Sequence, residues 1–153
     1  MDHRIWKPNV TVAALVERDG RLLLVEEETE EGVRFNQPAG HLDEGESLVQ
    51  ACIRETLEET AFHFTPASLL GVYQWQWHKP EGAITYLRFA FVGEPGEEEV
   101  GRALDTGILR AVWMTPAEIE AEQSRHRSPL VWQCVQDWLS GRRYPLDLIH
   151  HHG

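Results

Sequence analysis

The stretch from Gly40 to Phe62 constrains the fold most, because it joins a tight loop to a strongly patterned helix. Ser47 is a good helix N-cap, and Gln50, three residues later, completes a capping box. The apolar residues after this cap recur at helical spacing and predict a buried face: Leu48, Val49, Cys52, Ile53 and Leu57. We therefore expect a helix that begins after Ser47 and packs one side against a core.

A second face of this helix carries three carboxylates, Glu55, Glu58 and Glu59. Their i, i+3, i+4 spacing places them a turn apart on one side of the helix. Like charges at this spacing repel by roughly 0.2–0.5 kcal/mol per pair, and a cation held between them would turn that repulsion into attraction. Carboxylate oxygens are ligands that Mg²⁺ prefers, together with water and substrate phosphate.

Other residues of the stretch stand at fixed distances from these carboxylates: Gly40, Glu46, Arg54 and Phe62. A solvated acidic helix face is the usual explanation of a charge run, but it does not account for this spacing. The whole pattern resembles the Nudix box, the metal- and diphosphate-binding motif of the Nudix hydrolases. Because the pattern spans a loop and a helix, it is more specific than a short motif.

The stretch departs from that motif at two positions. Thr56 stands where the family has an aliphatic residue, and Ala61 stands where it has glycine. Glycine suits a left-handed residue at a helix end. We therefore expect Ala61 to cost about 1 kcal/mol in that conformation, unless the helix ends by another route.

The resemblance implies a role for each charged residue of the box. Three glutamates and the Gly40 carbonyl would hold Mg²⁺, which Mn²⁺ can replace: Glu55, Glu58 and Glu59. Arg54 would pair with Glu46, fix the loop against the helix and so belong to the catalytic group. The alternative for Arg54 is a surface ion pair of little energetic value.

The general base is left open by the sequence. Glu55 is the first candidate, since a carboxylate beside the metal is well placed to accept a proton from the attacking water. The resemblance also allows a loop acid to serve as base, here Asp105 or a member of the acidic run that contains Glu98. The default interpretation of each loop acid is a solvated surface group.

Candidate substrate-binding residues lie outside the box. Trp75 and Trp77 share one face of a predicted strand and are able to stack on a flat ring, although core packing is an equal alternative. Arg88 is a candidate phosphate clamp. Gln37 is a candidate because it lies in the segment that leads into Gly40.

The rest of the chain predicts runs of strands with three helices. Strands are expected at residues 10–16, 21–25, 33–37, 69–77, 84–92 and 108–114, and further helices after Thr115 and Ser128. Acidic loops are expected at residues 26–31 and 93–107. This pattern predicts an α/β chain of the α+β or mixed-sheet type, and the resemblance implies an α/β/α sandwich with a mixed β-sheet. We expect a single domain over residues 1–153, with a disordered tail from about residue 147.

Further segments between about residues 8 and 149 resemble one bacterial phosphatase branch of the Nudix family: Gln74-Trp75, Leu87-Arg88-Phe89 and Arg127-Ser128-Pro129. This implies Mg²⁺-dependent removal of terminal orthophosphate from nucleoside tri- and diphosphates. It also implies the same reaction on thiamine diphosphate and on the diphosphate of its hydroxymethylpyrimidine precursor. The alternatives are a Nudix pyrophosphohydrolase, which releases a larger fragment from nucleoside triphosphates or dinucleoside polyphosphates, and a non-catalytic ligand sensor. The intact carboxylates favour an enzyme over a sensor.

Composition excludes some partners. The formal net charge is −11 and the sequence pI is about 5.1, so we expect neither general nucleic-acid binding nor attraction to an anionic membrane. The expected partner is a small-molecule di- or triphosphate, bound by a monomer or a homodimer. Cys52 and Cys134 show no metal or redox spacing and are expected to be buried. With no long apolar run, the sequence predicts a cytoplasmic protein.

Overall fold

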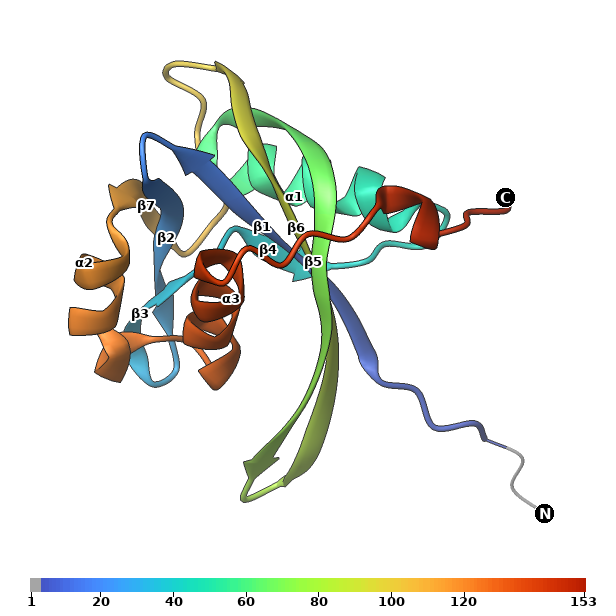
Figure 1. The fold of residues 1–153 in the computed structure, drawn as a ribbon. Helices are drawn as coiled ribbons and strands as arrows, with labels where there is room; N and C mark the ends of the chain where they lie inside the picture. Colours follow the sequence, from blue (N-terminus) through green and yellow to red (C-terminus); the bar gives the residue numbers. More distant parts are fainter. Residues whose placement is uncertain (1–3) are drawn as a thin grey trace.

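A seven-stranded mixed sheet forms the middle layer of the computed structural model, which describes residues 4–153 (Figure 1). Its strands are β1 (Asn9–Arg18), β2 (Arg21–Thr29), β3 (Gly32–Asn36), β4 (Ala39–His41), β5 (Phe62–Lys79), β6 (Gly82–Glu98) and β7 (Ile108–Met114). The order is β3-β2-β1-β6-β5, with β4 beside β1 and β7 beside β2. β1 runs parallel to β6 and the other pairs are antiparallel, which confirms the expected mixed sheet.

Helices cover both faces of the sheet. They are α1 (Leu48–Thr60), α2 (Pro116–Ala121) and α3 (Pro129–Leu139), with 3₁₀ turns at Gln123–Arg125 and Leu146–Leu148. Alternation along β1 assigns its side chains to two separate cores. Val12 and Ala14 pack with Cys52 of α1, whereas Ala13 and Leu15 pack with residues of α2 and α3 such as Ile119 and Cys134. The expected sandwich is therefore confirmed, and both cysteines are buried.

The strands β2, β5 and β6 are longer than the sequence indicates. The expected acidic loop at residues 26–31 is wrong over residues 26–29, because β2 continues to Thr29. This part of β2 pairs with β3 on one side and β7 on the other, so backbone pairing outweighs the low strand propensity of glutamate. Likewise β6 continues to Glu98, into the stretch expected to be a loop.

The hairpin of β5 and β6 projects from the body of the molecule (Figure 1). It closes through a tight turn in which Lys79 pairs with Gly82, as the turn residues predict. Along the projecting part of β5, exposed side chains such as Gln76 alternate with half-buried ones, among them Trp75 and Trp77. One face of the hairpin is thus aromatic and the other is polar.

The ends of α1 show how the local sequence shapes the helix. Both hydrogen bonds of the expected capping box are present between Ser47 and Gln50. At the other end Ala61 adopts φ 66° and ψ 8°, and its N–H donates to the Leu57 carbonyl at 2.9 Å. The helix therefore ends in the left-handed conformation although no glycine is present.

The chain is ordered by packing beyond the expected boundary at residue 147. Leu146–Leu148 forms a 3₁₀ turn, and both Leu146 and Ile149 pack against the core on the α1 side. The expected start of the tail, about residue 147, thus falls within this turn, and the disorder of the tail stays a prediction. Residues 150–153 are exposed and have no regular structure. None of the helices within residues 4–153 has the length and apolar character needed to cross a membrane.

Candidate metal and substrate site

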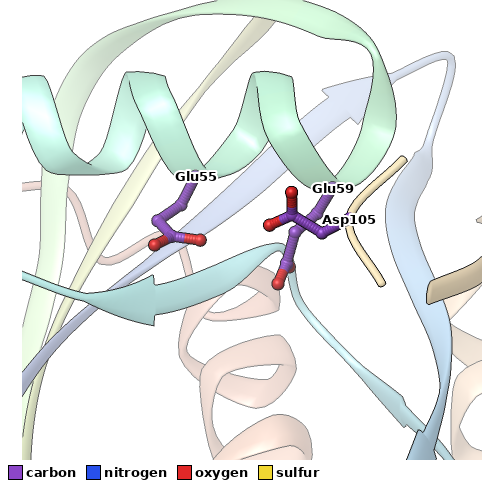
Figure 2. Close-up of side chains that lie close together, drawn as sticks. All are labelled: Glu55, Glu59 and Asp105. Carbon is purple, nitrogen blue, oxygen red and sulfur yellow. The ribbon is translucent and has the colours of Figure 1, made fainter. Parts of the chain in front are cut away.

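Three carboxylates converge at the C-terminal half of α1: Glu55, Glu59 and Asp105 (Figure 2). One oxygen of each lies within 4.8 Å of the others. Asp105 comes from the loop between β6 and β7, and its backbone N–H donates to the Glu58 carbonyl at 3.0 Å. That hydrogen bond ties the loop to α1 and so places an acid remote in sequence beside two box residues.

These groups fit a divalent cation by their chemistry and their crowding. Burial raises the pKa of Glu55, and it raises the pKa of Glu59 to about 9 although the Ala39 N–H donates to that carboxylate. A Cβ at Gly40 would lie 2.1 Å from the Glu55 carboxyl carbon, so glycine alone lets this carboxylate lie against the β4 backbone. Buried oxygen ligands that repel one another are stabilised by a hard cation such as Mg²⁺.

Arg54 joins the loop to the helix, as the sequence predicts. Its Nε donates to Glu46 Oε2 at 3.0 Å and its Nη2 to Glu46 Oε1 at 2.6 Å, a bidentate pair. The Nη1 group donates to Glu55 at 2.8 Å and to Glu58 at 3.2 Å. Arg54 therefore orients Glu55 directly, and Glu58 lies against Arg54 rather than in the three-carboxylate cluster.

A pocket of about 350 Å³ extends from the carboxylates to the aromatic face of the β5–β6 hairpin. Glu55 and Glu59 line one part of it, and Trp75, Trp77 and Tyr86 line another. The ring centroids of Trp75 and Trp77 are 5.7 Å apart at an interplanar angle of 15°. Those of Trp75 and Tyr86 are 5.8 Å apart at 19°. The aromatic rings thus form a nearly parallel set at the pocket wall.

The structure places Arg88 in the pocket wall but not Gln37. Arg88 is 6% exposed and lines the pocket, and its Nη1 donates to Gln37 Oε1 at 2.9 Å. Gln37 is fully buried, and its Nε2 donates to the Val131 carbonyl at 2.9 Å. The expectation that Gln37 contacts substrate is therefore wrong: its amide is used at both ends, and it holds Arg88 in place.

Glu98 does not reach the site either. It ends β6 opposite Phe62, is exposed and does not line the pocket. Of the two alternative bases named from the sequence, only Asp105 lies beside Glu55 and Glu59.

The pocket residues that the site prediction leaves out include four polar side chains: Glu27, Asn36, Arg127 and Ser128. Glu27 belongs to the acidic run assigned to a loop, and strand alternation would have separated it from Glu26 and Glu28. The other three lie in segments that resemble the phosphatase branch, which gave no role for their side chains.

The fold and the site together define the class of protein. A NUDIX domain profile matches residues 6–133, and the chain belongs to the Nudix family of hydrolases. Membership makes it a hydrolase of phosphoric anhydrides, in a family that generally uses divalent metal ions.

Its relatives narrow the class further. The chain is 38% identical to phosphatase NudJ of Escherichia coli K12 over 145 residues, which cover 95% of this chain and 92% of that protein. A solved Nudix hydrolase from Nitrosomonas europaea is 51% identical, with a TM-score of 0.91 and coverage of 95% of this chain and 98% of its own. A MutT Nudix hydrolase from Burkholderia pseudomallei, 20% identical with a TM-score of 0.72, covers 86% of this chain and 98% of its own and shares the fold. The chain is thus a NudJ-like phosphatase homologue.

Proposed function

We propose that this protein removes the terminal orthophosphate from small-molecule diphosphates and triphosphates in a Mg²⁺-dependent reaction. The substrates would be nucleoside di- and triphosphates, hydroxymethylpyrimidine diphosphate and thiamine diphosphate. The observation that carries the proposal is one pocket lined by the half-buried Glu55 and Glu59 of the carboxylate cluster and by a set of parallel aromatic rings. The cluster suits a metal-held diphosphate, and the rings suit a flat base or pyrimidine.

The chain's own residues have distinct tasks in this proposal. Glu55, Glu59 and the Gly40 carbonyl would hold the metal with Asp105, and Glu58 would join them on release from Arg54. A divalent cation there supplies positive charge to the phosphate oxygens and acidifies the attacking water. Glu55, fixed by Arg54, would accept the proton, with Asp105 as the alternative base.

The choice of bond rests on the relatives rather than on the carboxylates. The name of the E. coli relative is that of a phosphatase, and it matches nearly the whole of this chain. A pyrophosphohydrolase would use the same carboxylate cluster with the substrate placed differently, because in-line attack requires the water opposite the leaving oxygen.

A substrate panel tests the proposal. Nucleoside di- and triphosphates and hydroxymethylpyrimidine diphosphate are incubated with enzyme and Mg²⁺, and orthophosphate and pyrophosphate are measured separately without added pyrophosphatase. We expect orthophosphate from all of them, complete loss with EDTA, and recovery with Mg²⁺ or Mn²⁺. Pyrophosphate as the first product would support the pyrophosphohydrolase. Binding without turnover in the presence of Mg²⁺ would support the ligand sensor.

A further inference from the structure

A row of hydrogen-bonded polar side chains crosses the pocket wall next to the aromatic rings. Arg88 Nη2 donates to Asn36 Oδ1 at 3.0 Å, and Asn36 lies on β3, the strand that pairs with β2 where Glu27 lies. At the far end of the row, Arg127 Nη1 donates to Glu27 Oε1 at 3.2 Å. The row is anchored in the core by Gln37, so its members are held in fixed positions before any ligand binds.

Two charged groups of this row, Arg88 and Glu27, have hydrogen-bonding capacity that the row itself does not use. Within residues 4–153 no carboxylate lies at ion-pair distance from Arg88, whose guanidinium donates to the amide oxygens of Asn36 and Gln37 and to the Cys134 sulfur. The Glu27 side chain is 16% exposed and accepts a hydrogen bond from Arg127, whereas a carboxylate has about four acceptor sites. Burying charge with incomplete partners is costly, and a ligand that offers both a donor and an acceptor would relieve it.

The position of Glu27 argues against a phosphate at this part of the pocket. A carboxylate repels a phosphate oxygen and has no proton to donate to it. Arg127 already pairs with Glu27, and Arg88 is separated from it by one amide side chain. The row therefore presents an acceptor, Glu27, and a donor, Arg88, on either side of Asn36 in the pocket that Trp75 and Tyr86 also line.

We propose that Glu27 and Arg88 select substrates whose flat ring carries an exocyclic amino group next to a ring nitrogen. Glu27 accepts a hydrogen bond from the amino group, and Arg88 donates one to the ring nitrogen. This assigns Arg88 to the ring rather than to the phosphate. The inference rests on the proposed function for its substrate, an aminopyrimidine or cytosine-type diphosphate, and makes Glu27 a specificity-determining residue.

Cytidine and uridine diphosphates test this directly, because they share sugar and diphosphate and differ at the ring edge. Orthophosphate release should give a kcat/KM for CDP that is roughly tenfold or more above that for UDP, the effect of one charged hydrogen bond. Glu27→Gln should bring this ratio close to one, mainly by raising KM for CDP. Glu27→Asp keeps the charge but shortens the side chain, and it should lower the ratio as well.

A matched control variant separates the possible kinetic results. Glu28→Gln removes the same charge from an exposed neighbour on β2 and should leave the ratio unchanged. Equal turnover of UDP by the unaltered protein would overturn the inference. So would an unchanged ratio in both folded Glu27 variants, or an equal loss on both substrates, which would place Glu27 at the metal.

If neither diphosphate yields orthophosphate, the proposed function fails and the inference is still decided by binding. Tryptophan fluorescence then measures the affinities of CMP and UMP, without any reaction. Tighter binding of CMP by roughly tenfold, lost in Glu27→Gln, supports the assignment. Equal affinities overturn it.

Discussion

At the scale of single residues, Ala61 is a point of strain that the sequence identifies in advance. It adopts φ 66° at the end of α1, a conformation that costs an L-residue about 1 kcal/mol and glycine almost nothing. Ala61→Gly should therefore raise the free energy of unfolding by about 0.5–1 kcal/mol, since the greater freedom of glycine in the unfolded chain offsets part of the gain. Urea denaturation measures this change.

The control for this substitution lies in the same helix. Ala51 is buried within α1, where glycine is unfavourable, so Ala51→Gly should lower stability by at least about 1 kcal/mol. A loss of stability in both variants would mean that the Ala61 methyl group contributes more through packing than its backbone conformation costs.

Other residues of the site could not be assigned from the sequence, because their roles depend on which way a side chain points. Gln37 was expected to contact substrate, yet burial turns its amide toward Val131 and Arg88. Arg54 was predicted correctly as a partner of Glu46, because loop and helix are adjacent in the chain. Asp105 was only one of several loop acids until the β6–β7 loop was seen to bond to α1.

At the scale of elements, α1 provides a test of the metal ligands. Glu59→Gln should lower kcat at saturating Mg²⁺ by at least about 100-fold because it removes a proposed metal ligand. The fold should be kept, because the change relieves repulsion among crowded carboxylates. Glu58→Gln should also lose most activity if Glu58 turns from Arg54 to the metal. Steady-state kinetics and thermal melting are measured together.

Glu120→Gln serves as the control for these variants, since this exposed residue of α2 lies outside the pocket. Near-normal turnover of Glu59→Gln would remove Glu59 from the ligand set. Near-normal turnover of Glu58→Gln alone would limit the α1 ligands to Glu55 and Glu59.

The projecting β5–β6 hairpin provides a second test at this scale. Trp75→Ala should raise KM several-fold for CDP but much less for inorganic pyrophosphate, because only the nucleotide offers a ring to stack. Gln76→Ala, on the opposite face, is the control and should change neither value. A large fall in melting temperature with unchanged KM would show that Trp75 acts in packing alone.

Sequence patterns located most elements but not their lengths. The capping boxes placed the starts of α1 and α2, because capping is encoded within four residues. The continuation of β2 through three glutamates was missed because it depends on backbone pairing with β3 and with β7, and β7 is distant in sequence. Because these residues were assigned to a loop, Glu27 was not predicted as a site residue, although its position on a strand face places it in the pocket lining.

At the scale of the whole molecule, the topology brings distant segments together at one pocket. The parallel pairing of β1 with β6 sets Thr11 opposite Arg88, and β4 pairs with the other edge of β1 and contacts α1. Neither pairing follows from local periodicity, so the sandwich was inferred from family resemblance. The same arrangement allows the metal ligands and the ring-binding wall to come from different parts of the chain.

The central claim is that water attacks the terminal phosphorus of the substrate. Hydrolysis of a nucleoside triphosphate and of the matching diphosphate in ¹⁸O-labelled water, followed by mass spectrometry of the products, tests this most directly. The account predicts that the label enters orthophosphate in both reactions and that the triphosphate passes through the diphosphate. Label in the nucleoside monophosphate or in released pyrophosphate would contradict it.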